Sequence, residues 1–211
     1  MANLKQEYLP YIWTPDDYFE QASIESIFGG DTDGADIEVD IGCGEGSFLV
    51  EMARRYPERY FLGIERYLGR VCKVAKKAGQ AELSNLRLLR LESVYSVAWL
   101  LPSQSMSRVH LICPDPWNKK KQQKKRVICD QAFKRGIERM LIGGGEFLLK
   151  TDQREYCETA RAEFSQIESM REQPWNETEE SYAFSDFEKQ WLAMGRSMHT
   201  AKWVKIYSIL K

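Results

Sequence analysis

The stretch Ile37-Glu-Val-Asp-Ile-Gly-Cys-Gly-Glu-Gly46 decides the fold of this 211-residue chain. Its first five residues carry three β-branched apolar side chains and predict a short strand. Three glycines at alternate positions then allow a tight turn in which the backbone can approach a ligand. Phe48, Leu49, Met52 and Ala53 repeat at helical spacing, which predicts a helix directly after the turn. A strand, a glycine loop and a helix in this order indicate a parallel α/β domain.

The rest of the chain continues the alternation of strands and helices. Further strands are predicted at 60–64, 86–91, 109–113, 146–150 and 201–209, and further helices at about 67–80, 127–141 and 153–167. The helix at 127–141 is expected to end in a turn at Gly143–Gly145, and residues 168–185 are expected to be rich in loops. This order predicts a Rossmann-like, mostly parallel sheet with helices on both faces. We expect one domain at 36–211, preceded by an N-terminal extension at 1–35.

Composition narrows the possible settings and partners. No run of 18 apolar residues and no signal peptide are visible, and the five cysteines are scattered, so we expect a protein of the reducing cytoplasm with no metal site. The net charge of −1 hides an asymmetry, because residues 54–126 hold seventeen Lys or Arg against five acids. A basic half of this kind is typical of proteins that bind nucleic acid.

Acidic residues stand where the predicted strands end. They are Glu65, Glu92, Asp115 and Asp152, and Asp40 lies two residues before the first glycine. Ligands of parallel sheets bind beyond the carboxyl ends of the strands, so these acids and the turn of Gly42 and Gly44 are expected to line one site.

The individual acids suggest which nucleoside would bind. A carboxylate at Asp40 suits the cationic end of S-adenosyl-L-methionine better than a pyrophosphate. Glu65 is placed to accept hydrogen bonds from both ribose hydroxyls, which a nicotinamide dehydrogenase would also require. Glu92 is placed either to meet an adenine amino group or to stand as an exposed acid at a helix start. The GxGxG spacing, rather than GxGxxG, disfavours the dehydrogenase.

The segment Pro114–Arg126 combines an acid, an indole and a block of cations. Asp115 is held between two prolines, Trp117 follows, and six cations occupy the next nine residues. The prolines restrict the backbone and present the carboxylate rigidly. Trp117 is suited to stack on a base or to be a buried structural side chain, and the lysine block is suited to phosphates or to a solvated face. Together they favour recognition of a base and its phosphates.

Six motifs of the chain, taken in order, resemble those of a known family. VDIGCGEG, LGIER, NLRLLRLES, PDPWNKKKQQKKR, LKTD and SDFEKQWLAMGR stand in the order found in the tRNA (guanine-N(7)-)-methyltransferases, the bacterial TrmB family, over about residues 36–205. The resemblance implies a class I methyltransferase fold with a seven-stranded sheet. It also implies methyl transfer from S-adenosyl-L-methionine to N7 of guanine 46 in the variable loop of tRNA, leaving S-adenosyl-L-homocysteine.

The resemblance also assigns roles to residues. Cofactor contacts are implied for Asp40, Glu65, Glu92 and Asp115, with Asp115 also the catalytic or base-orienting acid, and the turn of Gly42 and Gly44 is expected to contact the same cofactor. Substrate contacts are implied for Lys119, Asp152, Ser185, Asp186, Phe187 and Glu188. From its indole, Trp117 is expected to contact the substrate as well, and from their charge Lys120, Lys121, Lys124, Lys125 and Arg126 are expected to contact RNA phosphates. The two histidines, His110 and His199, are expected to be structural.

The chain departs from the family pattern at a few positions. Asn118 replaces a usual proline, Lys121-Gln122-Gln123 replaces histidines with arginine, and Asp186 reverses the charge of a usual lysine. Two alternatives therefore stay open: a weak or inactive tRNA-binding paralogue, and a methyltransferase that acts on another substrate. A monomer or a homodimer fits the sequence equally well, and no membrane association is expected.

Overall fold

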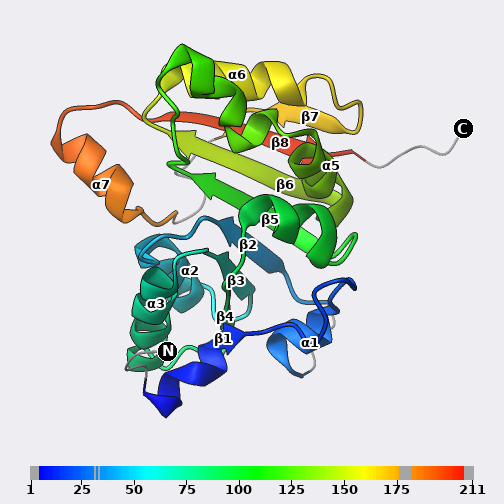
Figure 1. Ribbon diagram of the computed structural model, residues 1–211, viewed down its shortest axis with the longest axis vertical. Coiled ribbons are helices and arrows are strands. Elements are labelled where there is room, and N and C mark those ends of the chain that lie inside the picture. The colour runs from blue at the N-terminus through cyan, green and yellow to red at the C-terminus, as the bar shows by residue number, and fades with distance from the viewer. Residues whose placement is uncertain (1–4, 31, 33, 176–181, 207–211) are drawn as a thin grey trace, which may run out of the picture.

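The computed structural model describes residues 5–30, 32, 34–175 and 182–206. An eight-stranded sheet runs through its centre in the order β1-β4-β3-β2-β5-β6-β8-β7 (Figure 1). The strands are β1 (Ile12–Trp13), β2 (Ile37–Ile41), β3 (Tyr60–Ile64), β4 (Leu86–Leu89), β5 (Met106–Ile112), β6 (Leu141–Thr151), β7 (Met170–Gln173) and β8 (His199–Lys205). Pairs from β1 to β6 are parallel, whereas β8 pairs antiparallel with both β6 and β7.

Helices cover both faces of this sheet. They are α1 (Ile24–Phe28), α2 (Ser47–Arg55), α3 (Leu68–Gln80), α4 (Ser93–Tyr95), α5 (Gln131–Met140), α6 (Arg154–Phe164) and α7 (Asp186–Ala193), with a π-helix η2 (Ser96–Leu100) and 3₁₀ turns η1 (Gln6–Tyr11), η3 (Lys120–Lys125) and η4 (Val127–Cys129). The side chains of α2 and α3 form one apolar cluster, and those of α1, α5 and α6 form the other.

The central strands are buried on both sides, as a parallel sheet between helices requires. Successive residues of one strand enter opposite clusters: Phe61 packs with α2 and α3, whereas Leu62 packs with the other cluster. Leu148 and Leu149 divide in the same way. The glycine loop must also lie close to α3, because a Cβ on Gly46 would stand 2.5 Å from the Val74 side chain.

The Rossmann-like α/β fold, with a mostly parallel sheet, is confirmed. Beside the seven strands β2–β8, the structure adds the two-residue edge strand β1. The division at residue 35 stays a prediction, although β1 pairs with β4 and the buried Ile27 and Phe28 join the core of the domain.

Three local expectations need correction or a limit. Gly143–Gly145 do not form a turn after a helix but lie within β6, which begins at Leu141 and pairs with Met106 of β5. The segment 168–185, expected to be rich in loops, is irregular over most of its described residues but also contains β7, an edge strand. The final strand ends at Lys205, and the predicted residues 207–209 lie outside the described residues.

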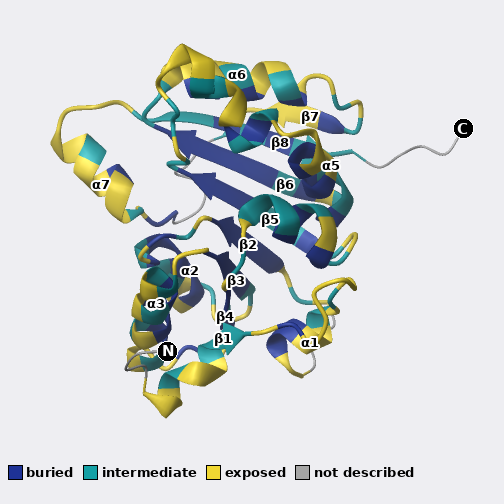
Figure 2. Cartoon of the chain, in the orientation of Figure 1, coloured by how far each residue is buried: buried dark blue, intermediate teal, exposed yellow. Residues whose placement is uncertain are grey.

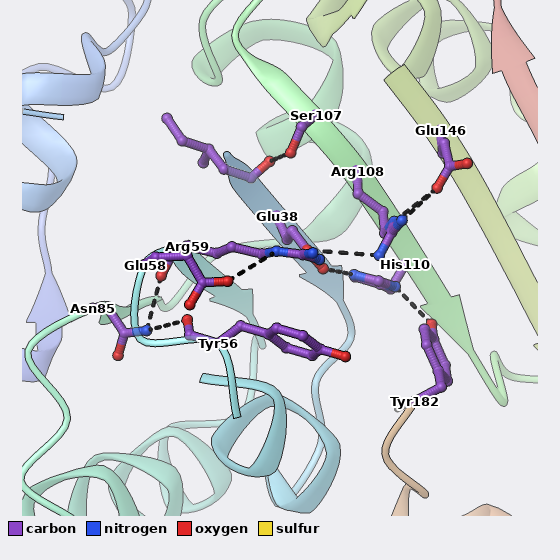
Figure 3. A network of polar contacts seen from close by, with 11 residues as sticks. Glu38, Tyr56, Glu58, Arg59, Asn85, Ser107, Arg108, His110, Glu146 and Tyr182 are labelled. Atoms are coloured by element: carbon purple, nitrogen blue, oxygen red, sulfur yellow. Dashed lines mark hydrogen bonds and ion pairs between the residues drawn. The ribbon is translucent and has the colours of Figure 1, made fainter. Parts of the chain in front are cut away.

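A buried polar network links the sheet to the segment before α7 (Figure 3). The Glu38 carboxylate accepts hydrogen bonds from Arg59 (2.9 Å) and His110 Nε2 (2.7 Å), and Tyr182 lies 2.7 Å from His110 Nδ1. Burial lowers the pKa of His110. A neutral ring protonated at Nε2 donates to Glu38, so its Nδ1 accepts from the Tyr182 hydroxyl. His110 is therefore structural, as predicted.

Candidate active site

Two adjoining cavities lie at the carboxyl edge of the parallel strands. The larger has a volume of about 570 Å³ and the smaller about 240 Å³. They share Gly42, Arg70, Ile112 and Phe187 in their walls. Residues that are far apart in sequence meet here because the parallel strands β2 to β6 end at the same edge.

The cavities bring most of the predicted site residues together. The larger is lined by Gly42, Glu65, Glu92, Asp115, Trp117, Lys124, Lys125, Asp152 and Phe187 among others, and the smaller by Asp40, Gly42, Gly44, Ser185, Asp186 and Phe187 among others. This placement agrees with the predicted roles, which themselves stay predictions. Lys119, Lys120 and Lys121 are exposed and line neither cavity.

Asp40 provides a direct test of whether a cationic cofactor fits. Its side chain is 3% exposed, and the described residues provide it with no ion-pair partner. Burial, and then the charge of Glu65, raise the pKa of Asp40 to about 7. A buried carboxyl of this kind is costly to ionise alone and is stabilised by an incoming cation. The sulfonium and ammonium groups of S-adenosyl-L-methionine fit that requirement.

The glycine loop leaves room for the same ligand. Gly42 and Gly44 have left-handed φ angles of 73° and 58°, so other residues would be strained at both positions. A Cβ on Gly42 would meet nothing within 4 Å, which places its Cα against the open cavity. The backbone is thus free to contact a ligand closely.

Glu65 and Glu92 line the larger cavity in different ways. The Glu65 side chain accepts a hydrogen bond from the Tyr67 backbone (2.9 Å) and stands 3.5 Å from Arg70 Nη1. This leaves a fixed carboxylate at the end of β3, suited to ribose hydroxyls. The Glu92 side chain accepts a hydrogen bond from the Tyr95 backbone (2.8 Å) and caps α4, so Glu92 does stand as an acid at a helix start. Its place in the cavity wall is compatible with an adenine contact as well.

The loop that presents Asp115 is strained and braced. Cys113 and Trp117, which bracket it, have φ angles of 48° and 44°. Residues other than glycine adopt this conformation at a cost, which is typical of functional loops. Arg126 Nε donates a hydrogen bond to the Pro116 carbonyl (3.0 Å) and thereby fixes the backbone of the loop. The Asp115 side chain is exposed and faces the cavity.

Arg126 corrects one prediction from sequence. It was expected to bind RNA phosphate and it lines the larger cavity, but it is 2% exposed and lies 5.1 Å from the Tyr156 ring, with hydrogen bonds to Pro116 and Thr159. A guanidinium with these partners braces the Asp115 loop instead. Lys124 and Lys125 are exposed and line the cavity, and Lys125 Nζ lies 5.4 Å from the Trp117 ring.

Glu188 requires a second correction. It was expected to contact the substrate guanosine, but its side chain is 1% exposed and forms a buried ion pair with Lys150 of β6. Glu188 and Ser185 also form a reciprocal capping box at the start of α7. The ion pair fastens α7 to the sheet, and the capping box orders the first turn of the helix. Asp186, the residue with the reversed charge, accepts a hydrogen bond from the Ser47 hydroxyl (2.7 Å).

Several cavity residues were missed by the sequence analysis. Arg70 lines both cavities and pairs with Glu65, and its only signal was its position in the helix after the LGIER motif. Trp191 and Arg196 line the larger cavity within the SDFEKQWLAMGR motif. Arg196 Nη1 donates to Asp152 (2.6 Å), a pairing across 44 residues that no local pattern reveals.

The sheet order, the glycine loop and the acids around it define a class I methyltransferase that depends on S-adenosyl-L-methionine. Known structures share this fold: the 16S rRNA methyltransferase KamB matches with a TM-score of 0.60 at 14% identity, over 82% of this chain and 88% of that one. A SAM-dependent O-methyltransferase from Thermotoga maritima matches with a TM-score of 0.57 at 12% identity, over 84% and 62% of the two chains.

Sequence comparisons place the chain more narrowly. A family model described as a putative methyltransferase matches residues 35–201. The tRNA (guanine-N(7)-)-methyltransferase of Syntrophotalea carbinolica is 30% identical over 90% of this chain and 82% of its own length, and that of Chlorobium phaeobacteroides is 40% identical over 59% and 61%. The chain belongs to the tRNA (guanine-N(7)-)-methyltransferase family.

Proposed function

We propose that this protein transfers a methyl group from S-adenosyl-L-methionine to N7 of a guanine in tRNA, at position 46 of the variable loop. The observation that carries the proposal is the presence of Asp115, in its strained loop, in the same cavity as Gly42, Glu65 and Glu92. A base-recognising carboxylate is thereby placed beside the site that fits the methyl donor. The named relatives support the choice of tRNA guanine.

Methylation of guanine N7 requires little proton transfer by the protein. Guanine N7 carries a lone pair and no proton, so no general base is needed. S-adenosyl-L-methionine, when bound, supplies an electrophilic methyl group. The residues of the chain must hold N7 in line with that group, a positioning effect that can contribute much of the rate. The exposed carboxylate of Asp115 is suited to stabilise the positive charge that develops on the purine.

Guanine differs from adenine by a pair of donors, N1–H and the exocyclic amine. Asp115 and Asp152 both line the larger cavity, and carboxylates accept such pairs of hydrogen bonds. Glu188, another expected substrate contact, is buried in its ion pair with Lys150, so we assign this role to Asp115 and Asp152. Lys124 and Lys125, which line the same cavity, are suited to bind the phosphates.

Methyl transfer to unmodified tRNA, followed by nucleoside analysis, tests the proposal. The wild-type protein should produce N7-methylguanosine, and Asp115→Asn should lower kcat by at least about 100-fold, the range seen when one charge-stabilising group is removed. Asp36→Asn is the matched control, because Asp36 is exposed and lines neither of the two cavities. Full activity of Asp115→Asn would refute its role. Binding of S-adenosyl-L-methionine and tRNA without any transfer would instead identify an inactive paralogue.

Location and assembly complete the proposal. Of the helices in the described ranges, none is long and apolar enough to cross a membrane. The five cysteines of the chain are free thiols. Together with a tRNA substrate, free thiols support a cytoplasmic location. A monomer or a homodimer is proposed for the free protein, and light scattering after size-exclusion chromatography distinguishes them.

A further inference from the structure

Three planar side chains form a row along one wall of the larger cavity. The rings of Phe187 and Trp191 in α7 are 6.4 Å apart between centroids, with 21° between their planes. The Arg196 guanidinium lies 4.1 Å from the centre of the Trp191 ring. All three residues line the cavity that also contains Asp115 and the predicted cofactor acids. The row therefore faces the place where chemistry is proposed.

This row does not serve the packing of the protein core. Among the residues of α7, only Glu188 is buried, so the helix places no apolar side chain in the interior. Phe187 is 42% exposed. Figure 2 shows α7 beside the layers of the molecule, near the carboxyl ends of β5 and β6, with most of its surface exposed. A helix of this kind ordinarily owes its place to a buried apolar face. Here that face lines a cavity.

Polar contacts hold the row at both of its ends. The buried ion pair between Lys150 and Glu188 fastens the start of α7 to β6, and the capping box of Ser185 and Glu188 orders the first turn of the helix. Beyond its end, Arg196 Nη1 donates to Asp152 (2.6 Å), directly after β6. The row is thus preorganised before any ligand arrives, which lowers the entropic cost of binding.

Flat aromatic rings and guanidinium planes in a cavity with basic residues are the elements with which proteins stack unpaired nucleobases. Lys124 and Lys125, which line the same cavity, would meet the phosphates of such a nucleotide. We propose that Phe187, Trp191 and Arg196 form a stacking subsite for a nucleobase of the RNA substrate. Arg196 is in addition a positioning residue, because it orients the Asp152 carboxylate toward the same base. The inference rests on the proposed function.

The test compares Trp191→Leu with Trp191→Phe, using an unmodified tRNA transcript as the probe. Stacking on one aromatic contributes about 5- to 100-fold, so Trp191→Leu should lower kcat/KM for tRNA and raise the tRNA Kd by a factor in that range. Trp191→Phe, which keeps a flat ring, should restore both to within about 3-fold of the wild type. The Kd for S-adenosyl-L-methionine and the salt dependence of tRNA binding should stay unchanged, because neither the donor site nor a phosphate contact is altered.

Two further variants separate stacking from folding. Leu192→Ser is the matched control, because Leu192 is 44% exposed on the same helix and does not line the cavity; it should leave kcat/KM unchanged. Arg196→Gln alters an exposed side chain and should lower kcat/KM at least about 5-fold, which covers the case in which Trp191→Leu fails to fold. Unchanged kcat/KM and Kd in both Trp191→Leu and Arg196→Gln would overturn the subsite, as would a Phe variant no better than Leu. A wild-type protein that binds tRNA but methylates no guanine would refute the proposed function instead, and the tRNA Kd values of the variants would still decide the subsite.

Discussion

Asp40→Asn should make the protein more stable above neutral pH while it weakens binding of the methyl donor. Asp40 is 3% exposed, and burial with the nearby Glu65 raises its pKa from 3.8 to about 7. Between these two values the folded state keeps a proton that the unfolded state has released. Stability therefore falls as the pH rises through this window and levels off above about pH 7. Asparagine is neutral throughout and does not contribute this fall.

The magnitude follows from the size of the pKa shift. A displacement of about three units corresponds to about 4 kcal/mol at 1.36 kcal/mol per unit, which is an upper value for a buried group beside another acid. The free energy of unfolding of Asp40→Asn, relative to the wild type, should thus rise by 2 to ~4 kcal/mol between pH 4 and pH 8. Urea titrations at several pH values measure it, with Asp36→Asn as the exposed control.

Ligand binding should respond in the opposite direction. A cation beside Asp40 favours the ionised carboxylate and lowers its pKa, so the wild type should bind S-adenosyl-L-methionine more tightly as the pH rises toward about 7. Binding near pH 6 should release protons, which titration calorimetry in two buffers of different ionisation enthalpy detects. Asp40→Asn should bind weakly at every pH and release no such proton. Equal stability of the two proteins at pH 8, or undiminished binding by the variant, would refute the reasoning.

The remaining predictions concern the basic segment and the buried network. Lys124→Ala combined with Lys125→Ala should weaken tRNA binding and reduce the slope of log K against log salt by up to about 2, measured by filter binding at several salt concentrations. Arg126→Ala should leave that slope unchanged and lower kcat, because it frees the loop of Asp115; a reduced slope would restore the phosphate role. Tyr182→Phe should lower the free energy of unfolding by ~1–3 kcal/mol in urea titrations, because Nδ1 of the buried His110 loses its donor; an unchanged value would contradict this pairing.

The placement of the acids could be predicted from the sequence because it depends on topology alone. Once Ile37–Ile41 and Tyr60–Ile64 are recognised as parallel strands, the residues that follow them must lie at one edge of the sheet. Asp115 and Asp152 follow by the same rule after β5 and β6. No knowledge of side-chain packing was needed for this step.

The errors arose where distant partners decide a residue's environment. Arg126 has the sequence context of one more cation in a basic block, but it is buried and contacts Thr159 and Tyr156, some 30 residues later in the chain. Glu188 is buried by Lys150, 38 residues earlier, and this pair has no local signal. Gly143–Gly145 lie in an irregular stretch of β6, between its pairs Leu141–Met106 and Glu146–Arg108 with β5, and no local pattern shows that the strand begins before them. β7 was missed because most of its residues are exposed, so it lacks an apolar alternation.

Helix α7 connects the two halves of the proposed reaction. Ser185 and Asp186 at its start line the smaller cavity with Asp40, Trp191 lines the larger, and Phe187 lines both. The Asp186 carboxylate accepts from the hydroxyl of Ser47, the first residue of α2 after the glycine loop. The reversed charge of Asp186 therefore makes a contact within the protein, at a helix N-terminus where a negative charge is favourable. Because in-line transfer requires the donor and the base to be held in one frame, a single fastened helix that borders both cavities is the element best placed to align them.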